Sequence, residues 1–132
     1  MKSIMTLLAL SAVLSLSACG PSTIAAPEGA SPEMSDAELS TLATAYKEYM
    51  AINGELKESD IHGSRVKTFL DKDAFAAYQA KSFPYADGSI SVKESYGSPD
   101  GAPEKLYVMK KIKGYDPGNG DWFYAVTSTE GI

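Results

Sequence analysis

Apolar and polar residues alternate in four short segments of the chain, each bounded by turns rich in Gly, Pro or Asp. This period of two predicts β-strands with one face toward a core. In SISVKESY (89–96), Ile90 and Val92 share one face, whereas Ser91 and Lys93 share the other. Because the last three segments follow one another through short turns, we expect an antiparallel meander. The predicted strands are 65–70, 89–96, 105–112 and 122–127.

A helical period of apolar residues predicts two helices in the remaining part of the chain. The stretch SDAE (35–38) is a capping box, in which the serine accepts from the third helical amide while the glutamate reaches back. Apolar residues then recur at helical spacing as far as Met50, and the Asn-Gly pair at 53–54 predicts the helix end. Asp71 is the predicted N-cap of a second, short helix at 72–81. The predicted fold class is therefore α+β, an antiparallel sheet meander with two flanking helices.

One face of the segment 89–96 carries small hydroxyl side chains and a single charge. Ser89, Ser91 and Ser95 share this face with Lys93. The pattern alone favours a face that is simply in contact with water. The alternative is that the three serines keep the face shallow, so that Lys93 can extend toward a ligand.

The final predicted strand is strongly apolar, and little chain follows it. Trp122, Tyr124 and Val126 share one face, and with Leu106 and Val108 on the neighbouring strand they are expected to need a covering layer. Because the chain ends soon afterwards, we expect it to be truncated at its C-terminus. An uncovered apolar face predicts marginal stability and self-association.

The N-terminal segment has the properties of a secretory signal. A positive charge at Lys2 precedes an apolar stretch (4–16) that is too short to span a bilayer. The stretch LSAC (16–19) matches the lipobox of bacterial lipoproteins, which predicts lipidation of Cys19; the alternatives are a buried thiol or an intermolecular disulfide. The predicted segments are a signal peptide at 1–18, a lipidated flexible tether at 19–33 and a folded domain at 34–132.

These features predict where the protein is located. Lipid on Cys19 would anchor it to a membrane, facing the periplasm. Gly20 follows the cysteine, in place of the Asp that resembles a retention signal for the inner membrane. We therefore expect a location at the bacterial outer membrane.

Charge and residue counts exclude several classes of function. The net charge is −5, and it becomes −6 without residues 1–18, whose only charged side chain is Lys2. Such an acidic domain is a poor candidate for binding nucleic acid. Cys19 and His62 are the only cysteine and histidine, so neither a zinc site nor a Ser-His-Asp triad can be assembled. We expect His62 to be a loop residue that faces solvent.

Two stretches resemble the cytochrome P-460 family. They are FPYADGSISVKESYG (83–97) and KKIKGYDPGNGDWFYAV (110–126), and the resemblance extends over about 65–126. It implies a mainly antiparallel sheet, a c-type haem and an oxidoreductase activity in hydroxylamine oxidation and nitric oxide chemistry. In the P-460 members a lysine after an Asp-Gly turn is cross-linked to the haem, and Lys93 matches that position. Cytochromes c-prime-beta, a related branch, lack this link.

The chain departs from the family in the residues that attach the haem. The family uses Cys-x-x-Cys-His, but this chain has no cysteine after Cys19 and no histidine after His62. No cofactor is therefore supported in the chain itself, and no catalytic or metal-binding residue is predicted. Two alternatives remain open: a haem-free lipoprotein that binds a small molecule or a protein partner, and a non-functional fragment.

Overall fold

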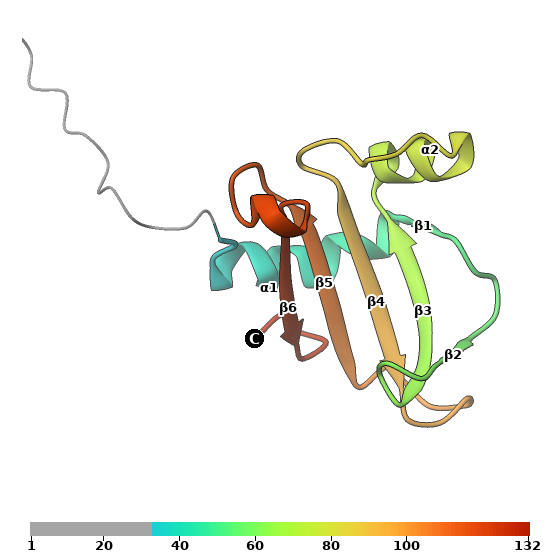
Figure 1. Cartoon of the computed structure of the whole chain (residues 1–132). Coiled ribbons are helices and arrows are strands. Elements are labelled where there is room, and N and C mark those ends of the chain that lie inside the picture. The colour runs from blue at the N-terminus through green and yellow to red at the C-terminus, as the bar shows by residue number, and fades with distance from the viewer. Residues whose placement is uncertain (1–32) are drawn as a thin grey trace, which may run out of the picture.

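A computed structural model describes residues 33–132, which form a six-stranded antiparallel sheet and two α-helices (Figure 1). The predicted α+β class is confirmed. The predicted signal peptide (1–18), Cys19 and the tether as far as residue 32 lie outside the described residues. In the part that is described, no helix has the length and apolar character needed to cross a membrane.

The strands follow the order β1-β3-β4-β5-β6, and β2 also pairs with β3. Strands β4, β5 and β6 form the predicted meander. The helices are α1 (Asp36–Ala45) and α2 (Lys72–Ala80), and two 3₁₀ turns, η1 (Tyr46–Glu48) and η2 (Pro117–Asn119), accompany them. The strands are β1 (Met50–Ala51), β2 (Lys57–Ser59), β3 (Ser64–Leu70), β4 (Ile90–Tyr96), β5 (Lys105–Lys111) and β6 (Trp122–Thr127).

The first helix begins as predicted but ends earlier. The capping box at Ser35 and Glu38 is present. The α-helix then stops at Ala45, so the prediction of a helix as far as residue 53 is wrong. Asn53 lies beyond the helix and has a different role. Its side chain accepts a hydrogen bond from the Thr68 amide at 2.9 Å and donates one to the Val66 carbonyl, both in β3. These bonds tie the connection after α1 to β3, where the unpredicted strands β1 and β2 pair.

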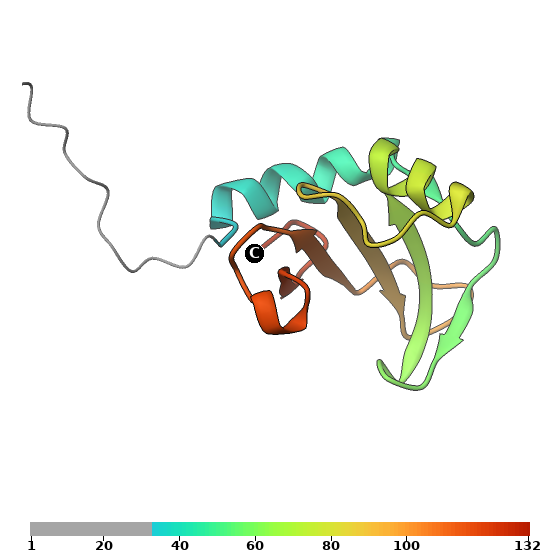
Figure 2. The same ribbon diagram turned by 45° about the horizontal axis from the view of Figure 1, so that its top comes forward.

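The sheet has one face covered by α1, which we call the covered face (Figure 2). Leu39, Leu42 and Tyr46 pack there against buried side chains of the strands, including Leu106 and Val108. The expectation that Leu106 and Val108 need a further covering layer is therefore wrong. Burial of each such side chain contributes about 1.5–3 kcal/mol to stability.

The opposite side is the open face, and it carries Trp122, Tyr124 and Val126 of β6. Tyr124 and Val126 are 62% and 64% exposed. The expectation that these two apolar side chains are left uncovered is therefore confirmed. Short segments cover other parts of the open face: α2 at the end of β3 (Figure 1) and the tip of the β2–β3 hairpin.

Candidate functional site

The candidate site lies on the open face, and Lys93 is at its centre. Cross-strand pairing aligns Lys93 of β4 with Thr68 of β3 on one side and with Tyr107 of β5 on the other. The next pair of β4 and β5 aligns Ser91 with Met109. These side chains share one face because directly opposed residues of paired strands point the same way.

The serines of β4 do not form a wet face. Ser91 and Ser95 are only 8% and 1% exposed, and Lys93 is half-buried. The prediction of a simply solvated face is therefore wrong. The Ser95 hydroxyl is hydrogen-bonded at 2.8 Å to that of Ser64, the first residue of β3 after the turn of the β2–β3 hairpin. The small side chains instead form a floor beneath the segments that fold over the sheet.

A cavity of about 210 Å³ lies on this floor. Its walls come from β3, β4, β5, β6, α2 and the loop before β4, and they are mainly apolar and aromatic. Among residues 33–132, Lys93 is the only charged side chain that lines it. The walls include Leu70, Ala74, Tyr85, Ser91, Met109 and Trp122. An apolar hollow with a single cation is suited to binding a small apolar molecule through one polar group.

The loop before β4 forms one wall of the cavity through Tyr85. The Tyr85 ring meets the Trp122 ring edge-on, with centroids 5.8 Å apart. Burial, followed by the nearby Tyr78, raises the pKa of Tyr85, which therefore stays neutral at pH 7. The Asp87 carboxylate accepts from the Lys113 amide at 2.7 Å and holds the turn in place. The predicted turn before β4 is thus present, and it positions an aromatic wall.

The tip of the β2–β3 hairpin lies on the open face next to Lys93, without lining the cavity itself. His62 stacks on Tyr107, with ring centroids 3.9 Å apart and an interplanar angle of 22°. His62 is a loop residue as expected, but it is half-buried and does not simply face solvent. Burial, followed by the positive charge of Lys93, lowers the pKa of His62. The hairpin tip therefore folds over the open face beside Lys93.

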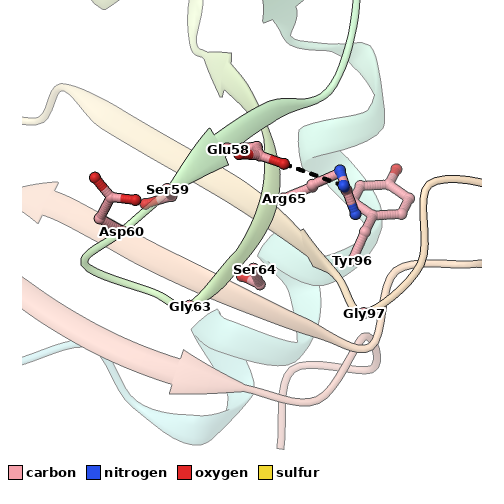
Figure 3. Close-up of a pocket in the computed structure, with 8 residues that line it drawn as sticks. All are labelled: Glu58, Ser59, Asp60, Gly63, Ser64, Arg65, Tyr96 and Gly97. Atoms are coloured by element: carbon pink, nitrogen blue, oxygen red, sulfur yellow. Dashed lines mark hydrogen bonds and ion pairs between the residues drawn. The ribbon is translucent and has the colours of Figure 1, made fainter.

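A second hollow, of about 390 Å³, lies beside the turn of the same hairpin (Figure 3). The Arg65 guanidinium contacts Glu58 at 3.1 Å and lies beside Tyr96, whereas the Asp60 carboxylate points away from this pair (Figure 3). Both partners of the ion pair are exposed to solvent. Because the arginine already has a carboxylate partner, this polar hollow is a weaker candidate for ligand binding.

A buried carboxylate on the covered face was not identified from the sequence. Glu94 is 9% exposed, and it accepts hydrogen bonds from Tyr46 at 2.7 Å and from Tyr96 at 2.5 Å. The sequence did indicate this burial, because Glu94 lies two residues after the apolar Val92 and therefore on the same face of the strand. The Tyr46 hydroxyl fixes the turn η1 to β4, whereas Tyr96 lies on β4 itself. We assign this cluster to stability.

The residues present do not fit a c-type haem. Residues 33–132 contain no thiol for a thioether bond, and their single imidazole is stacked against Tyr107. The cavity of about 210 Å³ is below the roughly 300–1,000 Å³ typical of sites for drug-sized ligands. Within residues 33–132, no three His, Cys, Asp or Glu side chains are grouped so that they could hold a metal ion.

Comparison with known proteins gives no family for this chain: no family model matches it, and no curated protein matches it significantly.

Proposed function

We propose that this protein is a haem-free, lipid-anchored binding module of the cytochrome P-460 type. It captures a small, mainly apolar molecule in the cavity on its open face. The observation that carries the proposal is the apolar cavity with Lys93 as its only charged lining residue. Lys93 follows the turn at Asp87 and Gly88, as the family resemblance implies, which supports the P-460 type.

The size of the cavity restricts the ligand. An apolar protein cavity of about 150 Å³ is sufficient to bind benzene. A volume of about 210 Å³ therefore suits a single ring with one small substituent. For about nine heavy atoms, a binding free energy of about 5.5 kcal/mol is reasonable, which corresponds to a Kd of about 0.1 mM.

The only tryptophan of the chain reports on this binding. Trp122 lines the cavity, so a ligand there should change its fluorescence. We expect titration with benzyl alcohol to give a saturable change. Ser91→Leu, which adds volume to the buried floor, should weaken binding at least tenfold, whereas Val126→Leu on the exposed part of the open face should not. A non-saturable signal, or equal binding by both variants, would contradict the proposal.

The haem-free and lipid-anchored parts of the proposal have separate tests. After expression in a host that matures c-type cytochromes, a denaturing gel stained for haem should show no band at the mass of this chain, and a band would contradict the haem-free assignment. Cys19→Ala should move the protein from the membrane fraction to the soluble fraction and abolish labelling by a fatty-acid analogue. Unchanged membrane recovery and labelling would contradict anchoring through Cys19.

A second candidate function is association through the exposed apolar strip of β6, which consists of Tyr124 and Val126. Exposed apolar side chains that lie side by side are typical of interaction surfaces. We expect self-association in light scattering at micromolar concentration. Val126→Lys should abolish it, and Thr129→Lys, at an exposed position after β6, should leave it unchanged. A monomer at all concentrations would contradict this candidate.

A further inference from the structure

The open face brings together two side chains that can carry positive charge, and one of them, Lys93, lines the cavity. Lys93 lines the cavity from β4 and lies directly opposite Tyr107 of β5. His62, from the tip of the β2–β3 hairpin, stacks on that same Tyr107. The pairing and the stack therefore place the imidazole beside the lysine from a different part of the chain.

The charged side chains around Lys93 and His62 favour the binding of an anion between them. On the open face of strands β3 to β6, the charged side chains are Lys93, Lys105 and Lys111, and no carboxylate lies among them. Within residues 33–132, neither Lys93 nor His62 forms an ion pair, and Asp60 on the same hairpin turn makes none with His62. Among the side chains that these four strands present on the open face, the charges are thus all positive, although the chain has a net charge of −5.

The other groups beneath His62 do not change this charge balance. Tyr107 of β5 is the ring on which it stacks, and Val126 of β6 is paired with Tyr107. Strand β3 contributes Val66 and Thr68 to this face. The titratable groups that face the imidazole from the elements beneath it are thus Lys93, Tyr107 and, further along β5, Lys105.

We propose that Lys93 and His62 form an anion-binding pair at the edge of the cavity, and that the ligand is a single-ring aromatic carboxylate. This inference rests on the proposed function, since the ring occupies the proposed cavity. The aromatic walls formed by Tyr85 and Trp122 contact the ring. The carboxylate lies between the lysine and the imidazole.

The pair makes binding dependent on pH. In the free protein, burial and the charge of Lys93 lower the pKa of His62, so the imidazole is mainly neutral at pH 7. A carboxylate beside it favours the charged form and raises that pKa again. Binding therefore takes up a proton, and affinity increases as the pH falls. If the bound anion raises the pKa by about one unit, the affinity changes by up to about tenfold across the titration.

The test compares benzoate with its neutral analogue benzamide on the full chain, with Trp122 fluorescence as the signal. Between pH 5.5 and 8, benzoate should bind more tightly than benzamide and should gain affinity as the pH falls. Lys93→Gln should weaken benzoate about tenfold and benzamide by a clearly smaller factor, because only the carboxylate loses a charge-assisted hydrogen bond. Lys47→Gln, at an exposed lysine of η1 away from the open face, is the control and should change neither.

The role of His62 is tested with two variants. His62→Gln should remove the pH dependence of benzoate binding. His62→Phe keeps a flat ring against Tyr107 but cannot be charged, so it should also remove the pH dependence while the hairpin remains stacked. If benzoate and benzamide bind equally and the variants have no effect, the anion pair is wrong and the cavity remains a binding site. If neither compound binds, the proposed function itself is wrong.

Discussion

Removing one hydroxyl group, with Tyr46→Phe, should strongly destabilise the fold. Tyr46 is 2% exposed, and its hydroxyl donates to the Glu94 carboxylate at 2.7 Å. The substitution keeps the ring and its edge-on contact with Phe69, at a centroid distance of 5.4 Å. The change therefore isolates one buried hydrogen bond from the hydrophobic contribution.

The expected cost follows from the charge and burial of the acceptor. A hydrogen bond to a charged group contributes about 1.5–3 kcal/mol, and the loss is largest where water cannot replace the donor. Because Glu94 and Tyr46 are both buried, we expect a loss of about 2 kcal/mol in the free energy of unfolding. For a domain of this size, that lowers the Tm by roughly 10 °C.

Tyr96→Phe is the matched control, since it removes the other donor to the same carboxylate. Tyr96 is only half-buried, so water can reach the vacated position, and we expect a loss of about 1 kcal/mol or less. Urea unfolding at pH 7, followed by circular dichroism, gives both values and shows whether the m-value is unchanged. A loss below about 0.5 kcal/mol for Tyr46→Phe would refute the assignment of this cluster to stability.

Three further predictions concern stability. Asp71→Ala should lower the free energy of unfolding in urea by about 1 kcal/mol, because the Asp71 carboxylate caps α2 by accepting from the Ala74 amide at 2.9 Å. Asp71→Asn keeps an acceptor oxygen at this position and should retain most of this stability. Gly131→Ala should lower the Tm by several degrees or more, because the φ of Gly131 is +87° and a Cβ there would lie 2.5 Å from the Leu39 carbonyl oxygen of α1. Gly54 has open space around it, so Gly54→Ala should leave the Tm unchanged. Stability should also fall above about pH 10. Burial and the hydrogen bonds to Glu94 raise the pKa of Tyr46 above its unfolded value and raise the pKa of Tyr96 to about 12. The two tyrosines therefore contribute fully to stability below about pH 10, and this contribution is lost as the pH rises through their folded pKa values. Equal Tm values at pH 9 and 11.5 would contradict this.

The strands of the meander could be predicted because their alternation reflects one buried face. The segment 89–96 was predicted as a strand, and β4 spans Ile90–Tyr96. In contrast, β1 and β2 are too short to show a period, and they pair with β3, to which the Asn53 side chain between them also bonds. The first helix was predicted too long because its apolar residues continue through Tyr46 into the turn η1, where that ring still points into the core.

The position of Lys93 on a serine-rich face could also be predicted, but the burial of that face could not. Alternation gives the two faces of a strand, without showing which segments cover each one. Ser95 is buried by the β2–β3 hairpin, and His62 reaches Tyr107 across the sheet, a contact between residues far apart in sequence. Leu106 was assigned to the wrong face for the same reason, since the register between β5 and β6 is not visible in either strand alone.

The most direct test of the binding site is to map benzoate on the protein by nuclear magnetic resonance. Amide shifts of the full chain, recorded during titration at pH 6, should change most at Lys93 and Met109, together with the indole N–H of Trp122. Shifts at a separate hollow along α1, which Ala37 and Thr41 line, should stay small. Changes centred on that hollow along α1, or no localised changes at saturating benzoate, would contradict the account.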